Sequence, residues 1–145
     1  MNKINQHPNL KNVPAVNKVT TSPIRVLIVD DHELTRLGLK LTLQSQPGIE
    51  LVGSATNGVE AVKMVEAVRP DVVVIDLQMP KLDGISASKQ INAVWPQARL
   101  IIHTAVDDPQ AEIFAQEARI DAIHHKARPS RELIDLVLKL GNRNK

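Results

Sequence analysis

The sequence predicts an α/β protein built on a doubly wound parallel sheet, and two observations support this prediction. Five short apolar runs alternate along the chain with five helical patterns, which is the signature of repeated βαβ units. One of these runs, Val72–Ile75, contains only β-branched residues and shows no polar alternation, as is typical of a central parallel strand covered on both faces. Right-handed crossovers then place helices on both sides of the sheet.

Each element follows from a local pattern of apolar residues and breakers. Strands are predicted at Arg25–Val29, Glu50–Ala55, Val72–Ile75, Arg99–His103 and Ala122–His125. Helices are predicted at His32–Gln46, Asn57–Val68, Gly84–Trp95, a segment capped by Asp107 or Asp108 with Pro109 in its first turn, and Arg131–Leu140. Helical spacing groups Leu34, Leu37 and Leu41 on one face of the first helix, and Val59, Val62 and Val65 on one side of the second.

Caps and breakers set the ends of these helices. Asn57 and Ser130 are suited to N-cap the second and last helices, and Gly141 fits the C-cap of the last. Pro47-Gly48 and Arg69-Pro70 interrupt the helical patterns that precede them.

The chain of 145 residues suits one folded domain with flexible ends. Residues 1–23 are rich in Asn, Lys, Pro and Thr without sustained periodicity, so we expect a disordered leader, a domain over 24–141 and a tail over 142–145. Hydrophobic residues make up 43%, enough for a core, and the absence of Cys excludes disulfide scaffolds and thiolate chemistry. Neither a signal peptide nor a membrane helix is recognised, so a soluble, cytoplasmic protein without membrane association is expected.

The net charge of +2 comes from the first 25 residues rather than from the rest of the chain. Residues 1–25 contain four basic residues and no acids, and removing these four from the 18 Lys and Arg leaves 14 against 16 Asp and Glu. Nucleic-acid binding normally needs a basic patch on a folded face. We therefore expect no direct DNA binding by this chain.

Polar or charged residues directly follow four of the five predicted strands. Asp30 and Asp31 follow the first strand, Asp76 the third, Thr104 the fourth and Lys126 the fifth. Because ligands of doubly wound sheets bind beyond the carboxyl ends of the strands, these side chains are expected to meet at one rim. Taken singly, each also fits an ordinary role as a helix cap, a loop acid, a strand-end hydroxyl or a solvated charge, so their joint placement carries the prediction.

This set of groups suits phosphoryl chemistry. Adjacent carboxylates repel unless a cation compensates them, and Mg²⁺ prefers oxygen ligands of this kind. Lys126 and Thr104 can contact phosphoryl oxygens by charge and by a hydrogen bond. Asp76, at the centre of the rim, is the candidate nucleophile because an aspartate can form an acyl phosphate.

These residues lie in motifs that resemble the receiver domain of two-component response regulators. The matching segments are Val26–Asp31, Val72–Pro80 with Asp83-Gly84, His103–Ala105 and Lys126. The stretch Asp30–Gly38 resembles the NarL/LuxR-type subfamily, and the similarity extends from about Ile24 to Leu140. It implies a flavodoxin-like (βα)5 fold with strand order 2-1-3-4-5.

The resemblance also implies a role for each site residue. Asp76 would accept a phosphoryl group from a sensor histidine kinase, a phosphotransfer protein or a small phosphodonor. Asp31, Asp76 and the backbone carbonyl of Gln78 would hold Mg²⁺, with Asp30 assisting through water, while Thr104 and Lys126 would contact the phosphate. The domain would catalyse only its own phosphorylation and dephosphorylation, and would then change the surface formed by its fourth helix, fifth strand and fifth helix toward an unknown target.

Several positions depart from the family pattern. Ile123 stands where an aromatic residue is usual, His124-His125 precede the lysine where apolar residues are common, and Arg119 and Ala127 replace a frequent Gly and a frequent Pro or Asp. A pH-sensing or metal-binding role for the His pair is disfavoured because consecutive strand residues point to opposite faces. All of these changes lie on the expected signalling surface.

Three other functions remain open at this point. The chain could be an adaptor that is not phosphorylated, a phosphoester hydrolase, or a DNA-binding regulator. Gln78 stands where an aspartyl-phosphate hydrolase typically carries a second acid, which disfavours the hydrolase. The chain ends five residues after Leu140 without a helix-turn-helix segment, so it is either a stand-alone receiver or a piece of a longer LuxR-type regulator, which could bind DNA.

Overall fold

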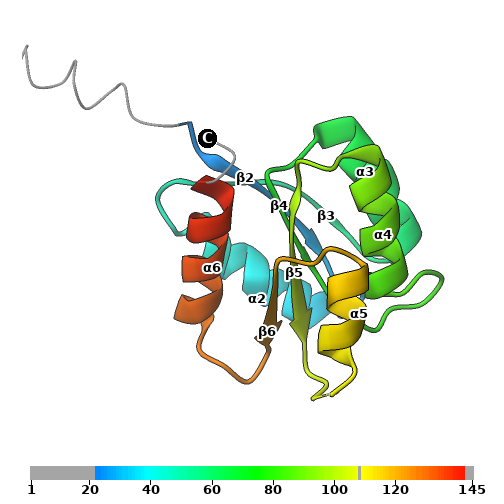
Figure 1. Ribbon diagram of the computed structural model, residues 1–145. Helices are drawn as coiled ribbons and strands as arrows, with labels where there is room; N and C mark the ends of the chain where they lie inside the picture. The colour runs from blue at the N-terminus through cyan, green and yellow to red at the C-terminus, as the bar shows by residue number, and fades with distance from the viewer. Residues whose placement is uncertain (1–21, 108, 143–145) are drawn as a thin grey trace, which may run out of the picture.

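A five-stranded parallel sheet forms the centre of the computed structural model, which describes residues 22–107 and 109–142 (Figure 1). The strands are β2 (Ile24–Val29), β3 (Ile49–Ala55), β4 (Val72–Ile75), β5 (Arg99–Thr104) and β6 (Ala122–His125). They lie in the order β3-β2-β4-β5-β6, which is 2-1-3-4-5 when the strands are counted along the chain. The predicted flavodoxin-like fold and strand order are confirmed.

Helices cover both faces of the sheet (Figure 1). They are α2 (Glu33–Gln44), α3 (Gly58–Val68), α4 (Gly84–Val94), α5 (Ala111–Glu117) and α6 (Ser130–Asn142). α2 and α6 enclose one hydrophobic core with the sheet, and α3 and α4 enclose the other. Among the described residues, no helix has the length and apolar character needed to cross a membrane.

The central strand β4 shows why the sheet is covered on both sides. All four of its residues are fully buried. Val72 and Val74 belong to the core beneath α2 and α6, whereas Val73 and Ile75 belong to the core beneath α3 and α4. The unbroken β-branched run therefore serves both cores, as the sequence predicts.

The predicted helix ends agree with the structure at some positions and not at others. The Asn57 side chain caps α3 by accepting a hydrogen bond from the Glu60 backbone amide. The predicted cap of the fourth helix at Asp107 is wrong, because α5 begins later, at Ala111 after Gln110, and Asp108 lies outside the described residues. The C-cap at Gly141 is also wrong.

Gly141 lies inside α6, which continues to Asn142. A Cβ atom at this position would overlap the side chain of Ile24 on β2. This glycine therefore permits close packing of the helix against the sheet instead of ending the helix.

The apolar face that helical spacing defines on α2 points to solvent. Leu34 is 81% exposed, and Leu37 and Leu41 are also exposed, whereas Leu39 and Leu43 pack in the core. The spacing rule fails here because leucines occur all around this helix, so periodicity alone does not select the packed side. On α3 the buried face is similarly formed by Gly58, Ala61 and Val65, while Val59 is exposed.

The predicted leader over 1–23 and tail over 142–145 fall largely outside the described residues. Ser22, Pro23 and Asn142 are the positions of these segments that the structure includes.

Candidate functional site

The carboxyl ends of β2, β4 and β6 bring the predicted charged residues together. Asp30 and Asp31 follow β2, Asp76 follows β4, and Lys126 follows β6. Asp31, Asp76 and Lys126 border a pocket of about 380 Å³ at the rim of the sheet. Its lining also includes His32, Gln78, Met79, Pro80, Ala105 and Val106. Residues from three segments that are distant in sequence therefore converge, because parallel strands direct all of their carboxyl ends to the same edge.

Lys126 connects two of the carboxylates. Its Nζ lies 2.9 Å from Oδ2 of Asp30 and 3.5 Å from Oδ2 of Asp76. Asp30 is only 1% exposed, and the Arg36 side chain donates a hydrogen bond to its backbone carbonyl. The ammonium group is thus positioned between a buried acid and the predicted nucleophile.

Burial sets the electrostatics of Asp76. Removal from solvent raises the pKa of its carboxyl group, and the nearby Asp30 raises this pKa further, while Lys126 and the Gln78 backbone amide lower it. Three carboxylates and one ammonium group give the pocket a net negative charge. Oδ1 of Asp31 is buried there without a hydrogen-bond partner. Such a pocket is suited to compensation by a cation.

The structure adds His32 to this set, a residue that sequence reasoning left without a role. Its Nδ1 lies 3.1 Å from Asp30, 3.2 Å from Asp31 and 3.7 Å from Asp76. The sequence signal for His32 is its position directly after Asp30 and Asp31. When these two acids lie near Asp76 at the ends of the strands, the residue that follows them lies near Asp76 as well.

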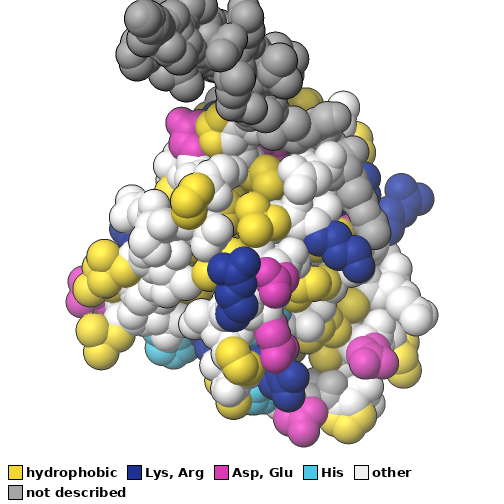
Figure 2. All heavy atoms as spheres, turned by 90° about the vertical axis from the view of Figure 1, so that its left-hand side faces the viewer, with side chains coloured by type: hydrophobic (Ala, Val, Ile, Leu, Met, Phe, Trp, Pro, Cys, Tyr) yellow, Lys and Arg dark blue, Asp and Glu magenta, His cyan; other side chains and the backbone are white. Residues whose placement is uncertain are grey.

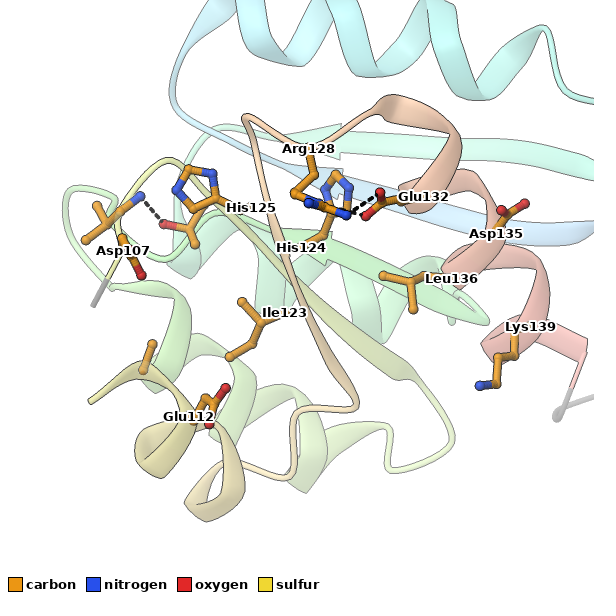
Figure 3. A pocket seen from close by; sticks show the side chains of 13 residues that line it. Asp107, Glu112, Ile123, His124, His125, Arg128, Glu132, Asp135, Leu136 and Lys139 are labelled. Carbon is orange, nitrogen blue, oxygen red and sulfur yellow. Dashed lines mark hydrogen bonds and ion pairs between the residues drawn. The ribbon is translucent and has the colours of Figure 1, made fainter. Parts of the chain in front are cut away.

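The Thr104 hydroxyl is directed differently from the other predicted groups. Its Oγ1 accepts a hydrogen bond of 3.0 Å from the Val106 backbone amide. The residue does not line the acidic pocket but a separate groove of about 530 Å³ between α5 and α6, over β6 (Figure 3). The structure thus brings the acids and Lys126 together and leaves Thr104 facing the neighbouring groove.

The helix α5 on one side of this groove is held by little buried surface. Ala111 and Ala115 are its buried residues, and Ile113 and Phe114 are exposed. A second hollow of about 410 Å³ lies on its other side, next to Phe114 and Glu117. This helix is therefore bordered by open space on two sides.

Gly84 sets the position of the loop that carries Asp76. Its amide donates a hydrogen bond of 2.9 Å to the Leu77 carbonyl, and a Cβ atom here would overlap the backbone carbonyl of Asp76. A side chain at this position would therefore push α4 away from the end of β4.

We expect Gly84→Ala to reduce the free energy of unfolding by about 1–3 kcal/mol, the usual cost of an overpacked core. Urea denaturation measures this change. Gly38→Ala is the matched control, because open space surrounds Gly38 inside α2 and alanine is the better helix former there. Equal stability of Gly84→Ala and the unmodified chain would show that the α4 contact is not restrictive.

Comparison with known proteins agrees with this geometry. The family model described as the response regulator receiver domain matches residues 26–138. The chain belongs to the response regulator receiver family. The response regulator protein VraR of Staphylococcus aureus is 34% identical over 116 residues, which are 80% of this chain and 56% of that protein. The receiver spans about half the length of the curated relatives it matches.

Solved structures give the same result. The signal receiver domain of the response regulator NarL from Mycobacterium tuberculosis superposes with a TM-score of 0.80 at 26% identity, covering 84% of this chain and 98% of that one. A CheX–CheY–BeF₃–Mg²⁺ complex from Borrelia burgdorferi contains a chain that matches with a TM-score of 0.76 at 27% identity, covering 82% and 90%. The NarL/LuxR-type resemblance is confirmed, and a receiver domain of this kind is consistent with phosphorylation-switched two-component signalling.

His124 is one of the positions at which the sequence departs from the family pattern. Its side chain is buried and stacks on the buried ring of His103. The two ring centroids are 5.4 Å apart and the ring planes are inclined by 16°. Nδ1 of each ring is buried without a partner. His125 points elsewhere and accepts a hydrogen bond from the Ala127 amide, in agreement with the predicted alternation.

The α6 side of the receiver mixes both signs of charge (Figure 2). Arg128 pairs with Glu132 and Arg131 with Asp135 along this helix. Acidic and basic side chains are therefore interleaved on this face, in contrast to the continuous basic surface that nucleic acids require.

Proposed function

We propose that this receiver accepts a phosphoryl group on Asp76 and signals through the surface around α5, β6 and α6. The observation that supports the proposal is the placement of the Asp76 carboxylate at the end of the central strand, with Lys126 Nζ 3.5 Å away and Asp30 and Asp31 beside it. Asp76 is the one carboxylate of this group that follows β4, the strand at the middle of the sheet.

In the proposed reaction an Asp76 oxygen attacks the phosphorus of the donor. A bond from this oxygen to phosphorus forms as the bond from phosphorus to the donor nitrogen or oxygen breaks, and the leaving group departs with the electron pair and takes a proton from solvent. Lys126 neutralises charge on the phosphoryl oxygens during transfer. Water later attacks the acyl phosphate, which releases inorganic phosphate and restores the carboxylate.

The donor atoms of the pocket fit Mg²⁺. They are carboxylate oxygens, which this ion prefers, and the buried Oδ1 of Asp31 accepts no hydrogen bond, although the His32 ring nitrogen lies 3.2 Å from it. Asp31, Asp76 and the Gln78 carbonyl would hold the ion, with Asp30 acting through water. When bound, Mg²⁺ supplies positive charge that offsets the charge of the transferring phosphoryl group. The relative crystallised with BeF₃ and Mg²⁺ supports this assignment.

Phosphorylation would then change the groove surface through Thr104. The new phosphoryl oxygens are strong acceptors for the Thr104 hydroxyl and the Lys126 ammonium group, so both side chains move toward them and the loop near Val106 follows. The output target would contact the groove between α5 and α6 (Figure 3).

The partner that supplies the phosphoryl group would be a sensor histidine kinase or phosphotransfer protein, and the receiver would meet it in the cytoplasm. The exposed Leu34, Leu37 and Leu41 offer it an apolar surface, because α2 begins directly after the acidic residues. A DNA-binding activity, if the chain is part of a longer LuxR-type regulator, would belong to segments beyond this one.

Incubation with acetyl phosphate, followed by intact-protein mass spectrometry, tests the proposal. We expect a mass gain of one phosphoryl group in the presence of Mg²⁺, removal of that group by hydroxylamine, and little gain with EDTA. Absence of labelling with Mg²⁺ would instead support an adaptor that uses the fold without phosphorylation.

A further inference from the structure

The side chain of His32 occupies an unusual position for the residue that precedes a helix. His32 is the N-cap of α2, yet its side chain makes no capping hydrogen bond. Side chains at this position commonly accept a hydrogen bond from an amide in the first helical turn. Here the imidazole turns instead toward the acidic pocket.

The ring is directed at all three carboxylates together. Its Nδ1 lies 3.1, 3.2 and 3.7 Å from oxygens of Asp30, Asp31 and Asp76, respectively. One donor atom from each of these four residues lies within 4.8 Å of the others, which is close enough to surround a single ion. The side chain of His32 is 64% exposed, so packing against other residues does not impose this direction.

The backbone supports the placement. The amide of His32 donates a hydrogen bond of 2.8 Å to Oδ1 of Asp30, which fixes the turn between β2 and α2. Asp30 is itself held by Lys126 through its other oxygen. A residue with a nitrogen donor is therefore held at the rim beside carboxylates that are already in position.

We propose that Nδ1 of His32 is a ligand of the metal ion held by Asp31 and Asp76. This inference rests on the proposed function, because it concerns the same pocket. An imidazole nitrogen adds a softer donor to an otherwise all-oxygen set, and such donors favour divalent transition metals over Mg²⁺. The site is thus selective for ions such as Zn²⁺ and Ni²⁺ relative to an all-oxygen receiver site.

A different role for His32 predicts the opposite effect of removing it. If the imidazole served only as a positive charge that pairs with the acids, it would compete with a metal ion, and its removal would tighten metal binding. If it is a ligand, its removal weakens the binding of transition metals and leaves Mg²⁺ binding nearly unchanged. The sign of the change therefore separates the two roles.

Electron paramagnetic resonance with Mn²⁺ as the probe tests the proposal without phosphorylation. Electron spin-echo envelope modulation of the Mn²⁺ complex is expected to show coupling to an imidazole ¹⁴N in the unmodified chain. The matched control His125→Gln is expected to show the same coupling. His32→Gln is expected to bind Mn²⁺ without this coupling. Its Ni²⁺ affinity, measured by displacement of Mn²⁺, should fall by about tenfold or more, the scale seen when metal-supporting groups are lost. Its Mg²⁺ affinity, measured by displacement of Mn²⁺, should change much less.

The other outcomes are distinguishable. Saturable Mn²⁺ binding without nitrogen coupling in the unmodified chain, or tighter binding by His32→Gln, would overturn the role of His32 and leave the oxygen site intact. Mn²⁺ binding that is absent, or that survives unchanged in Asp31→Asn, would overturn the metal site of the proposed function itself.

Discussion

Asp76→Asn is expected to abolish phosphoryl incorporation from acetyl phosphate in the presence of Mg²⁺. The amide has nearly the same shape as the carboxylate but lacks the anionic oxygen that forms the acyl phosphate. Because burial raises the pKa of Asp76, its ionised form is disfavoured in the folded protein, so an uncharged substitute should preserve or raise stability at neutral pH. Intact-protein mass spectrometry and urea denaturation measure the two effects.

Asp135→Asn is the matched control for this experiment. Asp135 is an exposed carboxylate on α6 that pairs with Arg131 and does not line the acidic pocket. This variant should be phosphorylated like the unmodified chain. Full, hydroxylamine-sensitive labelling of Asp76→Asn would refute the assignment of the phosphoacceptor.

The stacked histidines are expected to make the fold sensitive to mild acid. The pKa of His103 is lowered from 6.5 to about 4, mainly by burial and in part by Lys126 and His124, while Asp30 opposes them. The unfolded chain therefore binds more protons at this residue between pH 6.5 and pH 4, so the stability contribution is complete above pH 6.5 and is lost as the pH falls toward 4. A shift of this size corresponds to about 3 kcal/mol. Burial also lowers the pKa of His124, which adds an effect of the same sign.

Urea denaturation at a series of pH values measures this dependence, and NMR titration of the histidine ring protons reports the pKa directly. His103→Gln should flatten the profile between pH 6.5 and pH 4, whereas His125→Gln should leave its shape unchanged. A His103 ring that titrates near pH 6.5 in the folded protein would contradict the prediction, even if the variant folds poorly.

Much of the fold could be predicted because local patterns and sheet rules agree. The β-branched run at Val72–Ile75 indicates a strand with two packed faces, and the structure buries all four residues. Charged residues after the apolar runs predict one polar rim, because parallel strands end at the same edge. The convergence of Asp30, Asp31, Asp76 and Lys126 follows from these two arguments.

The remaining features depend on geometry that one-dimensional patterns do not contain. Leucines lie on all sides of α2, so the helical period does not identify which of them pack in the core. The His103–His124 stack depends on the register of β5 and β6, which pairs these two residues across neighbouring strands. The present direction of Thr104 is set by a hydrogen bond to the Val106 amide, a loop contact that the sequence does not specify.

The weak attachment of α5 has a consequence for the receiver before any phosphorylation. Its buried anchors are the methyl groups of Ala111 and Ala115, and burying two such groups stabilises the helix by only about 2 kcal/mol. If the alternative arrangement differs by the loss of these two contacts, a free-energy difference of this size leaves it populated at roughly 0.1–10%. The unphosphorylated receiver should therefore bind its target at a measurable basal level. A target at high concentration would stabilise the signalling conformation by binding to it, without phosphorylation by a kinase.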